Sequence, residues 1–172
     1  AFKTVSQSIL RAFPPLDIRA RRLALLVQDG FSMQEFETIQ DWAIKEGVIL
    51  ECISDHSGFV TSDTNATLPL KGNYQSEPSI FYDATVVLGG NKEVVPDQEG
   101  YLMHYIMETY KHLKPLVFLN GNERLITTMP LIEPDEGVIT MPNFTAVQEQ
   151  LKTALLKHRV WAREMQAKKI PA

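Results

Sequence analysis

The sequence is poor in the residues that build disulfide frameworks and zinc sites, because Cys52 is its only cysteine. A single thiol excludes an internal disulfide and a site built on a CxxC pair. No apolar run approaches the roughly 18 residues that a membrane-spanning helix needs, so no membrane partner is expected. Basic residues are few and dispersed: 17 Lys and Arg stand against 21 Asp and Glu, for a formal charge of −4. Nucleic-acid binding through phosphate neutralisation is therefore not expected either.

The start of the chain has no apolar secretory segment and no initiating Met. We therefore expect either a processed chain or a piece of a longer one. The expected location is cytoplasmic, and the alternative is secretion if the intact protein carries a signal peptide.

The 172 residues do contain a regular alternation of short apolar runs and helical patterns, over a length typical of one domain. The apolar runs cover residues 23–27, 48–53, 85–88 and 116–119, and the helical patterns cover residues 32–46, 97–114 and a segment from about residue 143. In the second helical pattern, Met103, Ile106, Met107 and Tyr110 form the expected buried stripe. Strands that alternate with helices predict crossover units, and so an α/β fold with a mainly parallel sheet.

Two segments depart from this alternation. Residues 1–19 contain a short amphipathic helical pattern and a Pro14-Pro15 break, and a basic stretch follows from Arg19 to Arg22. We expect a linker helix and a connection from an upstream domain, or alternatively a helix folded back on its own domain. Residues 58–70 hold two short β patterns around a polar turn, which predict a β-hairpin inserted at one edge of the sheet. Residues 20–172 would then form the α/β domain.

Ligands of such a sheet bind beyond the carboxyl ends of its strands, so the residues after each strand are the candidate site. After the first strand, Ser32 and Glu35 have capping-box spacing. In that motif the Ser32 hydroxyl accepts from the Glu35 amide, and the Glu35 carboxylate accepts from the Ser32 amide. The alternative is that Glu35 serves as an acid or base at the mouth of the sheet.

The third and fourth strands are each followed by glycine and asparagine. Gly89, Gly90 and Asn91 predict a tight turn or a close approach of the backbone to a ligand. Asn120 and Gly121 occupy the position of a nucleophile elbow, the sharp turn from strand to helix. An elbow of this kind needs Ser or Cys at its tip, and an Asn amide does not attack carbonyl groups.

Neither the thiol nor the imidazoles offer another reactive centre. Cys52 lies within the second apolar run, which is typical of a small core residue. His56, His104, His112 and His158 lack the spacing of metal ligands, so solvated or capping roles are expected and no metal site is predicted.

Taken together, these features resemble the class I glutamine amidotransferase-like fold and, more narrowly, the PfpI-type intracellular proteases. The shared features are the loop and helix with Glu35, residues 82–90 (Tyr-Asp-Ala-Thr-Val-Val-Leu-Gly-Gly) and the fourth-strand elbow. The chain is most similar to the C-terminal domain of large-subunit haem catalases. That likeness covers about residues 20–172 and is carried by residues 58–63 with 68–70, residues 110–115, and the tail at 158–161 and 169–172.

This resemblance implies a flavodoxin-like three-layer sandwich attached to an enzyme that decomposes hydrogen peroxide. The implied partners are the catalase core domain and the other subunits of a homotetramer. Haem would be bound only in that core, with no cofactor in this segment. The catalytic Cys of PfpI-type relatives corresponds to Asn120 here, and the companion acid to Glu35. The implied role is a non-catalytic accessory domain with a vestigial pocket made of Glu35, Gly89, Gly90, Asn91, Asn120 and Gly121.

Two other functions remain open at this point. The first is a chaperone-like module that holds unfolded client proteins on an adaptable surface of Met and Phe side chains. The second is a residual hydrolase or glyoxalase-like enzyme in which Glu35 acts as base and water as nucleophile.

Overall fold

The computed structural model describes residues 17–91 and 96–171, without the side chains of residues 96–98. Its elements follow one another as β1 (Arg22–Val27), α2 (Met33–Glu46), β2 (Ile49–Ser54), β3 (Phe59–Thr61), β4 (Thr67–Pro69), β5 (Gly72–Asn73), η1 (Ser79–Phe81), β6 (Ala84–Gly89), α3 (Pro96–Lys111), β7 (Leu116–Phe118), η2 (Asn122–Thr128), β8 (Val138–Thr140), η3 (Phe144–Ala146), α4 (Gln148–Leu156), η4 (Trp161–Arg163) and α5 (Glu164–Ala167).

Six of these strands form one sheet in the order β5-β2-β1-β6-β7-β8. Every neighbouring pair in this sheet is parallel, as the alternation of strands and helices predicts. The central strands are short and apolar on both sides because helices cover both faces. The carboxyl ends of β1, β6 and β7 therefore meet at one edge, where the predicted site residues follow.

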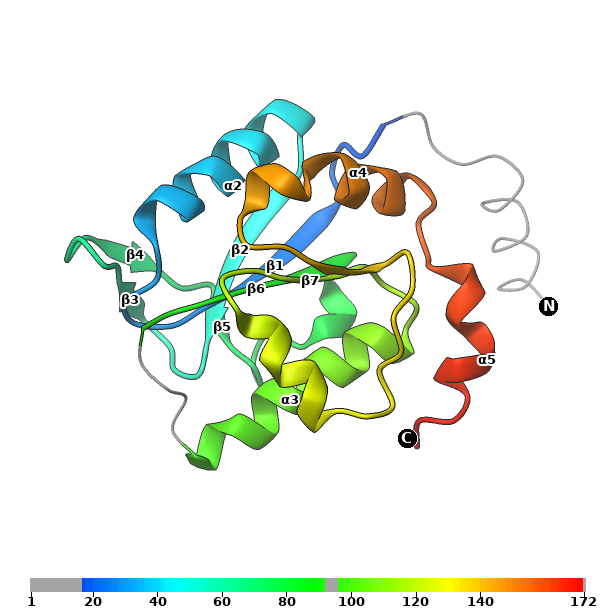
Figure 1. Cartoon of the computed structure of the whole chain (residues 1–172). Helices are drawn as coiled ribbons and strands as arrows, with labels where there is room; N and C mark the ends of the chain where they lie inside the picture. The colour runs from blue at the N-terminus through cyan, green and yellow to red at the C-terminus, as the bar shows by residue number, and fades with distance from the viewer. Residues whose placement is uncertain (1–16, 92–95, 172) are drawn as a thin grey trace.

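Helices α2 and α4 lie on one face of the sheet and α3 lies on the other, so the fold is the predicted flavodoxin-like three-layer sandwich (Figure 1). Successive residues of a strand point to opposite faces. Leu25 of β1 accordingly packs with Phe36 and Leu151 in the core under α2 and α4. Leu26 packs with Ile106 and Tyr110 in the core under α3. Cys52 is buried in the first of these cores, as predicted.

The predicted hairpin is present as the antiparallel pair β3 and β4, which forms a small sheet of its own. It is attached to the loop after β1 and does not extend the edge of the main sheet. The Gly30 amide donates to the Thr61 carbonyl at 2.7 Å, and the Asp63 amide donates to the Phe31 carbonyl at 2.9 Å. The hairpin therefore stands beside the carboxyl end of β1.

Three local predictions differ from the structure. Helix α3 ends at Lys111, before Lys114, and Leu113 adopts a positive φ of 64° ahead of Pro115. Its fully buried stripe contains Leu102 and Tyr105, whereas Met103 and Met107, which we predicted for that stripe, are only half-buried.

The last helix also begins later than predicted. Asn143 caps the short helix η3 by accepting from the Ala146 amide at 3.1 Å, and α4 starts only at Gln148. Most of the predicted helix of residues 1–19 lies outside the described residues, so it stays a prediction. Ile18 belongs to that segment and is fully buried in the core under α2.

Candidate functional site at the carboxyl edge of the sheet

The candidate site lies where β7 ends and the chain turns sharply. Asn120 has a left-handed backbone conformation with φ of 57°, and Gly121 follows with φ of 80°. Side chains with a Cβ adopt this conformation at a cost of roughly 1–2 kcal/mol, which Asn tolerates better than most. Both residues are exposed. The elbow is thus built with a residue that suits its backbone but has no nucleophilic atom.

Asn122 fastens this turn to the sheet. Its Nδ2 donates to the carbonyl oxygens of Leu88 at 3.0 Å and Leu119 at 2.7 Å. These two carbonyls belong to adjacent strand ends, so the Asn122 side chain bridges them. We did not single out Asn122 from the sequence. The available signal was an Asn directly after a turn glycine, where Asn side chains often bond to nearby backbone.

The Gly89-Gly90-Asn91 segment packs against the loop that follows β1. A Cβ at Gly90 would collide with the Asp29 carbonyl, and the Asn91 amide donates to that same oxygen at 3.2 Å. The Asn91 side chain in turn covers Gly30, where a Cβ would overlap it. The close approach that Gly90 permits is therefore made by the protein's own backbone.

Glu35 is tied to a second element. The Ser32 hydroxyl accepts from the Glu35 amide at 3.2 Å, which is the first half of the expected capping box. The prediction of a return bond from the Ser32 amide to the Glu35 carboxylate is wrong. Glu35 Oε2 accepts from the Phe144 amide at 2.8 Å instead. Phe144 stacks edge-on against Trp42 of α2, with ring centroids 5.3 Å apart. This packing brings the Phe144 amide within reach of the carboxylate, a long-range contact that capping rules cannot anticipate.

A shallow cavity of about 330 Å³ opens beside the elbow. Its walls are formed by Asn120, Gly121, Glu123, Thr140, Met141 and Pro142. Of the six residues predicted for the vestigial pocket, Asn120 and Gly121 line this cavity. Glu35 and the Gly89–Asn91 segment do not line it. The carboxylate at this cavity is that of Glu123, which the sequence analysis did not select.

The remaining reactive side chains lie elsewhere. Burial raises the pKa of the Cys52 thiol to about 12, so it is protonated at neutral pH. His104 and His112 line a cavity beside α3, whereas the ring of His56 contacts the Asp55 carboxylate at 2.7 Å. His158 contacts Arg21. Among the described residues, no three His, Cys, Asp or Glu side chains are grouped so as to hold a metal ion.

A family model described as the C-terminal domain found in long catalases matches residues 19–165. The chain belongs to this family. Relatives include a protein named catalase HPII from Pseudomonas aeruginosa, 34% identical over 159 residues, and catalase-B from Dictyostelium discoideum, 30% identical over 158 residues. Catalase-2 from Bacillus subtilis is 28% identical over 148 residues.

Both of the first two matches cover 91% of this chain but only 22% and 23% of the respective relatives. The chain thus corresponds to less than a quarter of their length. The matched part of this chain is the domain found at the C-terminal end of long catalases.

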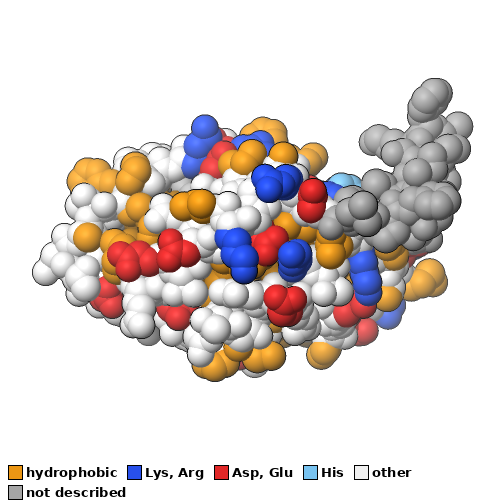
Figure 2. All heavy atoms as spheres, turned by 90° about the horizontal axis from the view of Figure 1, so that it is seen from above, with side chains coloured by type: hydrophobic (Ala, Val, Ile, Leu, Met, Phe, Trp, Pro, Cys, Tyr) orange, Lys and Arg blue, Asp and Glu red, His pale blue; other side chains and the backbone are white. Residues whose placement is uncertain are grey.

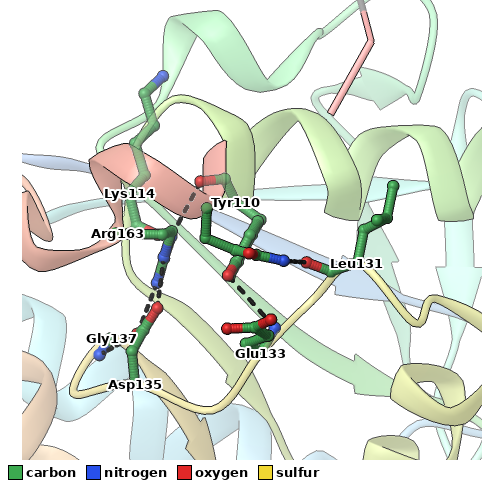
Figure 3. Close-up of polar contacts among 8 residues, drawn as sticks. Tyr110, Lys114, Leu131, Glu133, Asp135, Gly137 and Arg163 are labelled. Carbon is green, nitrogen blue, oxygen red and sulfur yellow. Dashed lines mark hydrogen bonds and ion pairs between the residues drawn. The ribbon is translucent and has the colours of Figure 1, made fainter. Parts of the chain in front are cut away.

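The tail of this catalase C-terminal domain is held by a buried arginine (Figure 3). The side chain of Arg163 is completely buried and forms paired bonds of 2.7 and 2.9 Å with the Asp135 carboxylate. It also donates to the carbonyl oxygens of Lys114 and Tyr110, and its guanidinium lies 4.2 Å from the centre of the Tyr110 ring. All of these groups belong to the protein itself, so the cluster acts as a clamp between the tail, α3 and the loop before β8.

A second group of basic side chains lies near the amino ends of the strands. His158 has a positive φ of 67° and contacts Arg21. Burial lowers the pKa of His158 to about 4, and the neighbouring charges of Arg159 and Arg21 add to this effect. Burial likewise lowers the pKa of Lys114 to about 8. His158 is therefore a neutral imidazole among cations at neutral pH.

Proposed function

We propose that this chain is the accessory domain of a long catalase, and that its role is to stabilise the assembled enzyme. The core of that enzyme would decompose hydrogen peroxide with its haem, and this segment would hold no cofactor. The observation that carries the proposal is the elbow: its strained backbone is retained at Asn120, but no nucleophile stands there. The family match supports the connection to a catalase core.

An open cavity between α2 and the β3–β4 hairpin supports a contact with the rest of such an enzyme. It has a volume of about 470 Å³, and its wall includes Phe36, Leu50 and Leu68. Ile44 at its rim is 72% exposed. Exposed apolar surface of this kind is typical of a protein contact. In this proposal the core domain or another subunit covers it.

The test compares the full-length catalase with a version truncated before residue 19. We expect equal peroxide turnover per haem at low temperature, together with earlier dissociation on heating, because only assembly contacts are lost. Light scattering would follow the oligomer and oxygen release would follow turnover. Loss of turnover in an intact oligomer would overturn the proposal, as would an oligomer whose stability is unchanged.

A client-holding function is the second candidate, favoured by the exposed large apolar side chains Ile44, Phe59 and Met165. On the face that carries α2 and α4, however, apolar side chains lie in small groups between charged ones (Figure 2). Light scattering from a heat-denatured client protein, mixed with this chain at near-equal molar ratio, decides between the accessory and the client-holding function. If this chain suppresses the scattering more than an inert protein of similar size and charge does, the result would support the holding function.

A residual hydrolase is the weakest candidate, because the Glu35 carboxylate already accepts from the Phe144 amide. Any hydrolase or glyoxalase activity that this chain showed would have to disappear in Glu35→Ala for that mechanism to stand.

Within the described residues, no helix is both long enough and apolar enough to cross a membrane.

A further inference from the structure

A cavity of about 450 Å³ lies between α3 and the segment that ends in η1, well within the size range of small-molecule sites. It shares no wall residue with the cavity beside the elbow or with that beside α2. Its walls follow one stripe of α3 through Tyr101, Tyr105 and Glu108, and continue to His112 just past the end of the helix. These positions span about three helical turns, so the cavity is elongated along the helix.

The cavity is mainly aromatic and apolar. Tyr74 and Tyr105 form adjoining parts of the wall, with ring centroids 5.9 Å apart. Tyr101 and Ile80 stand at its rim, 43% and 66% exposed respectively. Aromatic side chains bind flat apolar molecules through stacked or edge-on contacts. The Glu108 carboxylate at the wall disfavours an anion.

Three wall residues carry buried polar atoms for which the described chain offers no partner. The hydroxyl groups of Tyr74 and Tyr105 and Nδ1 of His112 are shielded from solvent, and none of them has a hydrogen-bond partner. Tyr105 as a whole is only 2% exposed. A buried polar group without a partner is costly and rare, and it points to an absent water or ligand. The described residues contain four such atoms, and three of them belong to wall residues of this one cavity.

We propose that this cavity binds an uncharged aromatic compound whose hydrogen-bond acceptor receives the Tyr105 hydroxyl. The ring lies among Tyr74, Tyr101 and Ile80, and the acceptor satisfies the buried donor. His112 lies seven residues further along the chain, just past the end of α3 and roughly 10 Å away, and its Nδ1 serves a donor at the far end of a longer ligand. The proposal does not depend on the catalase assembly.

The experiment titrates the 172-residue chain with two probes, benzimidazole and indole. The two molecules have nearly the same shape, but only benzimidazole has a ring nitrogen that accepts a hydrogen bond. Amide chemical shifts report the place and strength of binding. We expect shifts in residues 74–80 and 101–112, with a benzimidazole dissociation constant on the order of 1 mM, as befits a fragment. Indole should bind about five- to tenfold more weakly.

Tyr105→Phe separates binding from folding. Because the hydroxyl has no partner in the free protein, its removal should leave thermal stability unchanged or slightly raised. The same change should weaken benzimidazole binding about five- to tenfold and leave indole binding unchanged. Tyr101→Phe is the matched control, since it removes the hydroxyl of an exposed tyrosine at the rim of the same cavity and should alter neither probe's affinity.

Three results would overturn the proposal. The first is the absence of benzimidazole binding at millimolar concentration, which would leave ordered water as the partner of Tyr105. The second is equal affinity for the two probes in the parent and Tyr105→Phe proteins. The third is a set of shifts confined to another region, such as the β3–β4 hairpin.

Discussion

At the scale of single residues, backbone conformation explains the choice of Asn at the elbow. Asn120 has a φ of 57° and is exposed, so its side chain is selected by the turn and not by packing. Leu113 and His158 also have positive φ values, of 64° and 67°, but both make long-range contacts. The Leu113 carbonyl accepts from the Val160 amide, and the His158 ring contacts Arg21. Tertiary contacts therefore hold conformations that local preference disfavours.

Substitution of Asn120 should show this conformational preference directly. Asn120→Gly is expected to be neutral or slightly stabilising, whereas Asn120→Ala should lower the free energy of unfolding by about 1 kcal/mol. Urea denaturation followed by circular dichroism measures both. Equal stability of the Ala and Gly variants would contradict a left-handed elbow.

His158 should make the domain sensitive to acid. Its pKa falls from an ordinary value of 6.5 to about 4 in the folded protein, chiefly through burial and then through Arg159 and Arg21. The unfolded chain takes up the proton first as the pH falls, so the folded state loses stability between about pH 6.5 and pH 4. Asp83 opposes this shift, and Lys114 adds to it.

The expected loss from this one group is about 2 kcal/mol across that range. His158→Asn removes the imidazole and keeps a residue that tolerates positive φ, so its stability should depend less on pH by that amount. Urea denaturation at pH 7 and pH 4.5 measures the difference. His104→Asn, at an exposed position on α3, is the control and should keep the parent's pH dependence.

At the scale of elements, the last part of the chain is held by polar bonds as much as by apolar packing. Arg163 joins η4 to the carbonyl ends of α3 and to Asp135 before β8. Gln166 in α5 donates to the Leu131 carbonyl at 2.8 Å, which fixes the same loop a second time. In Figure 3 these bonds connect three chain segments around one guanidinium. The tail that carried much of the sequence resemblance is thus an anchored part of the fold.

Breaking this clamp should be costly. Arg163→Met leaves the Asp135 carboxylate without its partner and should lower the free energy of unfolding by about 3–5 kcal/mol. Asp135→Asn keeps one acceptor for Arg163, so its loss in the free energy of unfolding should be smaller. This variant can be measured if Arg163→Met does not fold. Lys157→Met removes an exposed pair with Glu136 and should change stability by less than about 1 kcal/mol. Urea denaturation measures the free energy of unfolding of all three variants. Equal losses in the three would contradict a buried clamp.

At the scale of the whole molecule, β1 connects the two cores. Leu25 contributes to the core under α2 and α4, and its neighbour Leu26 contributes to the core under α3. Both side chains are almost completely buried. Because one strand contributes to both cores, the two layers of helices should unfold together.

Leu25→Ala and Leu26→Ala should each lower the free energy of unfolding by about 3–5 kcal/mol, through lost burial and a residual cavity. Each should also accelerate hydrogen exchange in both α2 and α3 by a similar factor. Exchange measured by mass spectrometry after peptide digestion separates the two helices. Faster exchange limited to the helix on the mutated side would show that the layers unfold independently.

The sequence by itself determined the class of fold, the four central strands, the hairpin and the presence at Asn120 of a side chain that is not a nucleophile. These features depend on local patterns: apolar runs, helical periodicity, turn residues and the chemistry of one side chain. The short strand β8 was not predicted, because its apolar run contains only Val138 and Ile139, whereas the run that predicted β7 covers residues 116–119.

Only the tertiary structure decided which polar groups meet. The Glu35 carboxylate bonds to an amide 109 residues away, and Arg163 bonds to an acid 28 residues before it. Asn122, Glu123 and the cavity beside α3 were likewise found only in the structure. Contacts of this kind depend on how the layers pack and on which groups remain without water, and neither property has a local signature in the sequence.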